Sequence, residues 1–415
     1  MPNPPTLALT KQPTGLQKGA RSLFFRCIQR LQVGTLTIIE TFLDQGLPNK
    51  EHFAAPDRHE PYATIEIHHP QFYARLLKGG SIAAGEAYMD GWWSSPNLTV
   101  LMELMARNLS VSDGIEANSS LMTRLFYKVS HWLNHNSIAK AQKNIHAHYD
   151  LGNELYYTFL DSNMLYSCAL FLNKDDSLEQ AQLNKMDRLC QQLQLKPSDH
   201  VIEIGTGWGA MAIYMAKTYG CHVTTTTISE EQHHHTAQQI AKHGLQNRVT
   251  LLKADYRLLE GQYDKLVSIE MIEAVGKDYL PSYIKKCQSL LKPNGLMAIQ
   301  AITIADQRYD YYSNNVDFIQ KYIFPGGFLP SITALTVAAT KYSDLVVRNL
   351  FDLGTDYAKT LAHWRHRFEA AQHQVLELGY DEKFIRMWRY YFCYCEGGFL
   401  AKTISTVQMT LQRPM

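Results

Sequence analysis

From residue 201 onward, short strand-like runs alternate with longer helical stretches. The strand-like runs cover residues 201–204, 223–227, 249–252, 265–269 and 296–302. Strands that alternate with helices in this way predict a parallel sheet covered by helices on both faces. A last strand-like run at residues 403–411 is expected to close the sheet in the reversed direction. The pattern therefore predicts an α/β fold with a Rossmann-like sheet.

The first part of the chain has a different pattern. Residues 18–33 set apolar against basic residues at helical spacing, and strand-like runs follow at 35–40 and 63–68. A helix is expected over residues 70–77, ending at Gly79-Gly80. These shifts predict four segments: a disordered N-terminus (1–20), a small α/β domain (21–110), a helical linker (111–145) and a larger catalytic domain (146–415).

The basic helix at residues 18–33 is open to two interpretations. Phe24, Phe25 and Ile28 lie on one side, and Arg21 and Arg26 lie on the other. Such a helix can bind a membrane surface, or it can pack on its own domain. Its small size and modest charge favour packing on its own domain.

The overall charge excludes one class of partner. Forty basic and thirty-nine acidic residues leave a formal net charge of +1, so no global field recruits nucleic acid or an anionic bilayer. We find no apolar run of the length that spans a membrane, and residues 1–19 are Pro-rich and polar, unlike a signal peptide. A cytoplasmic protein is therefore expected.

No metal site is expected from the cysteines or histidines. The seven cysteines contain no CxxC pair, which argues against a zinc site and a disulfide framework. His233, His234 and His235 are consecutive, and on a helix they point about 100° apart, so they cannot converge on one ion. A solvated helix face is the better interpretation.

The strongest local motif is a buried strand that ends in Glu203 and leads into Gly205, Gly207 and Gly209. Glycines let the backbone turn tightly and approach a ligand closely. The spacing GxGxG differs from the dinucleotide pattern, and the acidic residue suits a ligand that carries an ammonium group. The motif favours S-adenosylmethionine over NAD, with a purely structural turn as the alternative.

The next two strands end in further candidate cofactor residues. The residues expected to border ribose and adenine are Thr227, Ile228 and Gln232. The same segment also fits a capping box, in which Ser229 caps a helix and Gln232 reaches back to it. After the third strand, Asp255 and Tyr256 stand where an acidic residue is expected to meet the adenine amino group.

Several other segments carry a resemblance to a known family. They are residues 85–93 (GEAYMDGWW), 148–153 (HYDLGN), 166–169 (YSCA), 273–276 (EAVG), 321–327 (KYIFPGG) and 390–395 (YYFCYC). With the glycine motif, they closely resemble the cyclopropane fatty acid synthases and mycolic acid cyclopropane synthases. The resemblance implies a class I methyltransferase sheet, a small N-terminal lipid-associated domain, and contacts of Tyr166 and Ser167 with the cofactor.

The resemblance also implies an activity. It predicts transfer of a methylene group from S-adenosylmethionine to a cis double bond of an unsaturated acyl phospholipid. The expected partner is a phospholipid bilayer, bound peripherally at the inner face of the membrane, and no nucleic acid is expected. A homodimer is left open. The alternatives are a C-methyltransferase that gives a methyl-branched or methylene lipid, a lipid-binding protein with a degenerate domain, and an N-methyltransferase of small amines.

The chemistry requires a base, because methyl transfer to an alkene leaves a carbocation that must lose a proton. The resemblance implies that a bound bicarbonate ion serves as this base. In the family, this ion is held by the backbone of a Cys and by the side chains of a Glu, a His and a Tyr. The corresponding residues here are Cys168, Glu273, Gln300 and Tyr357. Gln300 departs from the pattern, since the family's His-Thr-Ile is Gln300-Ala301-Ile302 here. A Gln donates a hydrogen bond but cannot carry imidazolium charge.

Two further groups of residues are weaker candidates. Cys395 matches a Cys once favoured as a nucleophile, but the mechanism needs no thiolate, which favours a structural role. Aromatic rings near the catalytic segments are expected to line an acyl tunnel and stabilise a cation, with core packing as the simpler alternative. These aromatic residues are Tyr322, Phe324, Phe328, Trp364 and Tyr391.

Overall fold

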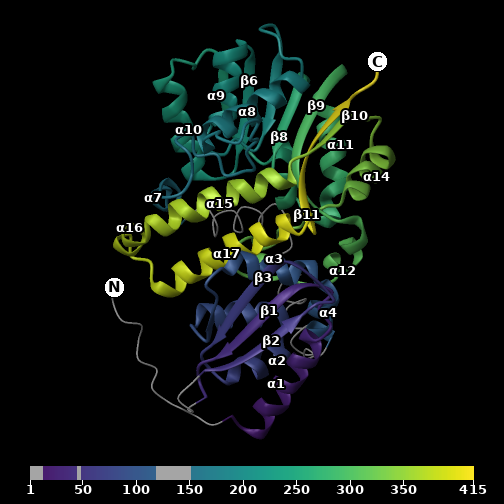
Figure 1. Cartoon of the computed structure of the whole chain (residues 1–415). Helices are drawn as coiled ribbons and strands as arrows, with labels where there is room; N and C mark the ends of the chain where they lie inside the picture. The colour runs from purple at the N-terminus through teal and green to yellow at the C-terminus, as the bar shows by residue number, and fades with distance from the viewer. Residues whose placement is uncertain (1–12, 44–47, 118–150) are drawn as a thin grey trace. The chain divides into compact units, whose positions relative to one another are not determined.

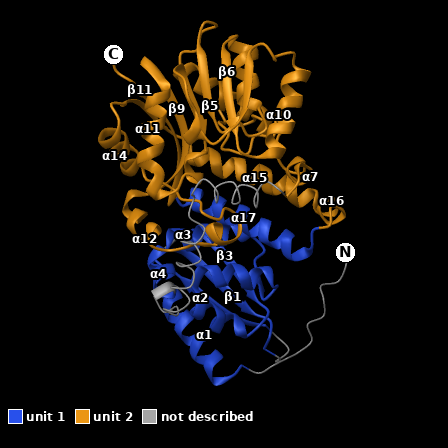
Figure 2. Cartoon of the chain, turned by 180° about the vertical axis from the view of Figure 1, so that it is seen from behind, with its two compact units in different colours: residues 1–127, 380–401 blue, residues 128–379, 402–415 orange. Residues whose placement is uncertain are grey.

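The computed structural model describes residues 13–43, 48–117 and 151–415 of the chain (Figure 1). The chain divides into two compact units (Figure 2): unit 1 comprises residues 1–127 and 380–401, and unit 2 comprises residues 128–379 and 402–415. Most of the predicted linker and the first half of the segment at 148–153 lie outside the described residues. Among the described helices, none is long and apolar enough to cross a membrane.

Within its described residues, unit 2 contains a seven-stranded sheet in the order β10-β11-β9-β8-β5-β6-β7. Strands β7, β6, β5, β8 and β9 are parallel, and β11 runs antiparallel to both of its neighbours. The predicted α/β fold with a reversed final strand is confirmed. The strands are β5 (His200–Ile204), β6 (His222–Thr227), β7 (Val249–Lys253), β8 (Tyr263–Ile269), β9 (Leu291–Ile304), β10 (Val346–Asp352) and β11 (Ile404–Gln412).

Helices cover both faces of this sheet. Val201 of β5 packs in one layer with α8, α9 and α10, and Ile202 packs in the other with α11 and α14. Strands buried on both faces are rich in apolar and β-branched residues, as in β5, β6 and β8, which is why the pattern located them closely. The helices of unit 2 are α7 (Asn153–Tyr157), α8 (Leu178–Gln192), α9 (Ala210–Tyr214), α10 (Glu230–Lys242), α11 (Leu280–Leu290), α12 (Tyr309–Ser313), α13 (Phe318–Tyr322), α14 (Ile332–Tyr342), α15 (Gly354–Ala370) and α16 (Gln372–Glu377).

Unit 1 is built on a smaller sheet, whose described strands have the order β2-β1-β3-β4. The two predicted strands correspond to β1 and β3, which are parallel neighbours, and β2 and β4 were not predicted. The strands are β1 (Val33–Glu40), β2 (Asn49–Ala54), β3 (Asp57–Ile67) and β4 (Trp93–Ser94), and the helices are α1 (Gly15–Ile28), α2 (Gln71–Met89), α3 (Leu98–Arg107), α4 (Leu109–Ala117) and α17 (Glu382–Leu400).

Helix α1 corrects the predicted extent of N-terminal disorder. It begins at Gly15, because Thr14 and Gln17 form a capping box that satisfies the first backbone amides. Its apolar face is buried within unit 1, and Arg21 forms a 2.7 Å ion pair with the fully buried Glu40 of β1. The structure thus shows the helix packed on its own unit, as the favoured interpretation predicts.

Two more boundaries differ from the predictions. Helix α2 continues to Met89 instead of ending at Gly79-Gly80; the backbone leaves helical geometry at Gly80, with φ 60°, and then resumes the helix. Helix α17 belongs to unit 1, so the catalytic region is not continuous from 146 to 415. It is held there by a 2.9 Å hydrogen bond from Thr99 to Glu396 and a 2.7 Å ion pair of Lys383 with Asp90.

Candidate active site

The glycine turn after β5 has the geometry that the motif predicts. Gly205, Gly207 and Gly209 have φ values of 97°, 53° and 94°, a region that side chains disfavour. A Cβ atom on Gly209 would lie 2.8 Å from Thr236 Cγ2, whereas a Cβ atom on Gly207 would meet nothing within 4 Å. Gly209 is therefore required by packing against α10, and Gly207 leaves the backbone open to a ligand.

Replacing Gly207 with Ala is expected to weaken S-adenosylmethionine binding at least tenfold, a change of about 1.4 kcal/mol. The added methyl group would occupy the space through which the ligand approaches. Gly244→Ala is the matched control, because Gly244 has φ 65° and equally open surroundings but follows the far end of α10. Calorimetry on both variants separates the ligand effect from backbone strain. Equal affinities in the two variants would refute the contact.

The carboxylate of Glu203 is buried beneath this turn. It accepts a 2.6 Å hydrogen bond from Thr225 on the adjacent strand β6. Burial raises the pKa of Glu203 to about 8, and the Thr225 hydroxyl limits the rise. The hydroxyl of Thr206, which follows at the turn, is buried with no hydrogen-bond partner among the described residues. The backbone space and this hydroxyl fit a polar ligand such as S-adenosylmethionine.

The turn after β6 contains the predicted helix cap and also orders the residues predicted to border ribose and adenine. Ser229 caps α10 by accepting from the backbone amide of Gln232. The Gln232 side chain, however, accepts a 2.9 Å hydrogen bond from Thr227. Ile228 lies half-buried between them. This network holds the predicted ribose and adenine residues at the carboxyl edge of the sheet.

Asp255 has a partner that the sequence did not predict. Arg257 donates to both of its carboxylate oxygens, at 2.8 and 2.7 Å. Burial alone would raise the pKa of Asp255, but the hydrogen bonds and charge of Arg257 lower it. Tyr256 beside it lies edge-on to Tyr283 with 5.4 Å between ring centroids. An adenine amino group would have to share the Asp255 carboxylate with Arg257.

A second group of residues converges on Glu270, directly after β8. Its Oε1 accepts hydrogen bonds from the backbone amide of Cys168 at 2.9 Å and from Gln300 at 2.8 Å, and its Oε2 accepts one from the Tyr357 hydroxyl at 2.8 Å. Burial raises the pKa of Glu270, and these hydrogen bonds and the charge of Lys185 limit the rise. Glu270 has φ 49°, a left-handed conformation that costs a non-glycine residue about 1–2 kcal/mol.

Gln300 is fully engaged by the protein. Its amide nitrogen donates to Glu270 and to the carbonyl of Cys168, and its oxygen accepts a 2.9 Å hydrogen bond from Gln408 of β11. Gln408 in turn accepts from Arg188 of α8 at 3.0 Å. A chain of hydrogen bonds thus fixes the Gln300 amide on Glu270.

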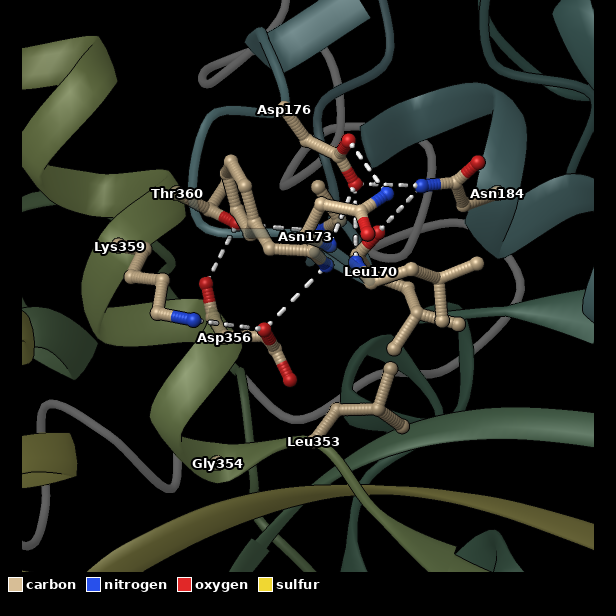
Figure 3. A network of polar contacts seen from close by, with 12 residues as sticks. Leu170, Asn173, Asp176, Asn184, Leu353, Gly354, Asp356, Lys359 and Thr360 are labelled. Atoms are coloured by element: carbon tan, nitrogen blue, oxygen red, sulfur yellow. Dashed lines mark hydrogen bonds and ion pairs between the residues drawn. The ribbon is translucent and has the colours of Figure 1, made fainter. Parts of the chain in front are cut away.

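The segment that carries Cys168 forms hydrogen bonds with two helices, α15 and α8 (Figure 3). Thr360 of α15 accepts a 3.1 Å hydrogen bond from the backbone amide of Ala169, and Asn184 of α8 donates to the carbonyl of Leu170 at 3.2 Å. Helix α15 also carries the Tyr357 hydroxyl. These contacts therefore bring the Cys168 amide and that hydroxyl to the same carboxylate.

Two further ionisable groups lie close to Glu270. Lys185 is fully buried, donates to Ser167 Oγ at 2.7 Å, and has its pKa lowered by burial. Glu273 accepts a hydrogen bond from the backbone amide of Ile302, and its second oxygen is buried without a partner among the described residues. Burial, with the nearby Glu270 charge, raises the pKa of Glu273 to about 8.

The remaining candidates are less closely grouped. The Cys168 thiol is fully buried beside backbone carbonyls, and burial raises its pKa, which does not suit a nucleophile. Cys395 lies on α17 in unit 1 and so belongs to a different unit from the Glu270 cluster. Tyr166 packs against Trp364 and Phe324 in unit 2, with centroids 5.2 and 6.2 Å away.

The other predicted tunnel residues have aromatic contacts of their own or belong to unit 1. Tyr322 contacts Phe318, and Phe328 contacts Tyr312. Tyr391 belongs to unit 1.

The residues predicted to hold bicarbonate do not fit that role here. The Glu270 carboxylate already accepts hydrogen bonds from the Cys168 amide, Gln300 and Tyr357. A bicarbonate ion would therefore find these donors occupied, and the negative charge of Glu270 would repel it. Sequence reasoning missed Glu270. The sequence offers one local signal for Glu270. It is an acidic residue directly after β8, a strand that pairs with β5, and it lies at the carboxyl edge of the sheet, where such folds bind ligands.

Comparisons with known proteins place this geometry in context. A sequence profile described as mycolic acid cyclopropane synthetase matches residues 136–409. The chain is 39% identical over 360 residues to tuberculostearic acid methyltransferase UfaA1 of Mycobacterium tuberculosis, covering 84% of this chain and 83% of the relative. It is 37% identical over 359 residues to the cyclopropane-fatty-acyl-phospholipid synthase of Escherichia coli, covering 85% and 88%.

A solved structure supports the same grouping. The mycolic acid cyclopropane synthase CmaA1, crystallised with SAH and CTAB, superposes with a TM-score of 0.61 and 28% identity. The match covers 66% of this chain and 98% of that protein.

Proposed function

Because this chain belongs to the mycolic acid cyclopropane synthetase family and is an S-adenosylmethionine-dependent methyltransferase, we propose that it transfers a methylene group to a cis double bond of an unsaturated acyl phospholipid. The product would be a cyclopropane fatty acyl chain. The observation that carries this proposal is the cluster of hydrogen bonds on the half-buried Glu270, which follows β8, the strand next to β5 and its glycine turn. A cation formed at this site would lie beside this carboxylate.

Each part of the site has a task in this reaction. Bound S-adenosylmethionine would supply an electrophilic methyl group, held by the backbone around Gly207 and by Thr206. An alkene is a weak nucleophile, so the reacting atoms must be held close together in a dry site. The rings of Tyr166 and Trp364 exclude water and present faces that stabilise a cation.

A second product is supported by one comparison. The relative that is 39% identical is named a tuberculostearic acid methyltransferase. If a hydride shifts within the cation before proton loss, the same methyl transfer gives a methylene chain, or a methyl-branched chain that keeps a double bond, instead of a ring. The Gln300 substitution, at the position of the family's His, makes this alternative chemically reasonable.

We further propose that unit 1 holds the protein at the inner, cytoplasmic face of a phospholipid bilayer. Helix α1 buries its apolar face but exposes Lys18, Arg26 and Leu16, and Arg30, just after its end, is exposed as well. Exposed basic residues attract anionic headgroups, and an apolar side chain can insert between them. No residue of the cofactor motif belongs to this unit.

The proposed function predicts a specific lipid product. Purified protein with S-adenosylmethionine and vesicles of monounsaturated phospholipid should add one CH2 unit to the acyl chain. Tandem mass spectrometry locates the addition, and catalytic hydrogenation separates a methylene product, which takes up hydrogen readily, from a cyclopropane. Saturated vesicles are the matched control and should stay unmodified. Addition to the headgroup amine would contradict the proposal and indicate N-methylation.

A further inference from the structure

We propose that the Glu270 carboxylate is itself the base of the reaction, in the place where the family resemblance predicts a bicarbonate ion. This inference rests on the proposed function, because it concerns the proton that the methylated lipid loses. It makes the enzyme independent of bicarbonate.

The first argument is the identity of the donors around Glu270. Three of the four groups expected to hold bicarbonate donate instead to this carboxylate: the Cys168 amide, the Gln300 amide and the Tyr357 hydroxyl. A carboxylate and a bicarbonate ion are both planar and present two oxygens to hydrogen-bond donors. Glu270 therefore satisfies the same donors with a group that is covalently attached.

The second argument is the backbone at Glu270. With φ 49°, this position favours glycine, yet it carries a long acidic side chain. Strained residues of this kind cluster at functional sites. The half-buried side chain is held by fixed partners, since the Gln300 amide is itself held by Gln408. The arrangement orients one carboxylate and occupies the donors that a second anion would need.

The third argument is the balance of the reaction. In methyl transfer, the alkene π pair bonds to the methyl carbon, sulfur keeps the S–C pair, and the second alkene carbon becomes cationic. Glu270 then accepts a proton from the new methyl group, and the released C–H pair closes the ring onto the cationic carbon. The protonated carboxyl returns its proton to water after the product leaves. No additional reactant is needed.

The decisive experiment is turnover on monounsaturated vesicles in bicarbonate-depleted buffer, with and without added bicarbonate. The parent should be equally fast in both buffers. Glu270→Gln should keep its affinity for S-adenosylmethionine but lose about 10²- to 10⁴-fold in turnover, the usual contribution of a general base. Glu260→Gln, at an exposed residue, is the control and should match the parent.

A second pair of variants tests whether a small anion can replace the Glu270 carboxylate between its three donors. Glu270→Gly removes the side chain and relieves the strained backbone, leaving the three donors for a small anion, so bicarbonate or formate should restore part of the turnover. Glu270→Leu fills the same space without an acceptor and should show no rescue. Equal responses of the two variants would overturn the inference.

The outcomes separate this inference from the proposed function. A parent that modifies lipid only when bicarbonate is added, or a Glu270→Gln variant as fast as the parent, would overturn the role of Glu270 and leave the proposed function intact. A parent that modifies no lipid in either buffer would overturn both.

Discussion

Replacing Lys185 with Met is expected to lower the free energy of unfolding by about 3–5 kcal/mol, the usual effect of removing one partner from a buried charge pair. Lys185 is fully buried, and the charges of Glu270 and Asp161 oppose the lowering of its pKa by burial. Without it, the Glu270 carboxylate loses its buried countercharge, and its pKa should rise further. Turnover should therefore fall together with stability.

Urea denaturation followed by circular dichroism measures this loss. Lys196→Met is the matched control, because Lys196 is exposed, and surface substitutions of this kind usually change stability by less than about 0.5 kcal/mol. A Lys185→Met variant as stable as the control would show that the carboxylate is not stabilised by this cation.

Stability should also depend on pH through Glu203. The folded-state pKa of about 8 lies above the usual value of 4.5, so between these values the folded protein keeps a proton that the unfolded chain releases. The free energy of unfolding should then fall as pH rises through this window, by up to about 1.4 kcal/mol per pH unit for this group. Glu273, whose pKa is also about 8, contributes with the same sign.

The Glu203→Gln variant should flatten this dependence and gain stability relative to the parent as pH approaches 8. Gln keeps the size of the side chain and can still accept the hydrogen bond from Thr225. Urea midpoints at pH 5.5, 6.5 and 7.5, roughly spanning the window of the titration, give the slope. Glu260→Gln should follow the parent at each pH. Parallel slopes for the two variants would show that Glu203 is ionised throughout.

Local pattern was enough to predict much of the fold. Strands β5, β6 and β8 consist mostly of apolar and β-branched residues because their faces are buried, and the glycine turn after β5 has a conformation that few other residues adopt. Strand β10 escaped prediction because it lies at the sheet edge, where residues such as Val346 and Leu350 stay exposed and show no burial period. Helix α2 was predicted too short, since Gly80 interrupts the helical geometry without ending the helix.

The candidate site was less predictable because its contacts join distant parts of the chain. The family resemblance selected Cys168, Gln300 and Tyr357, and the structure brings these together. It could not show that Glu270 lies between them, since an acidic residue after a strand is common. Lys185 reads as an ordinary polar position of an amphipathic helix, and its burial becomes visible only in the tertiary structure.

Helix α17 has a consequence for the order in which the chain folds. It packs so closely on α3 that a Cβ atom on Gly397 would lie 2.6 Å from the backbone nitrogen of Glu103. During synthesis on the ribosome, unit 1 must therefore wait for residues 382–400 before it can complete its core, while unit 2 waits for β11. Unit 1 is therefore completed only after most of unit 2 has been made, which departs from the usual N-terminal-first order of domains. No single cut in the chain separates the two units from each other.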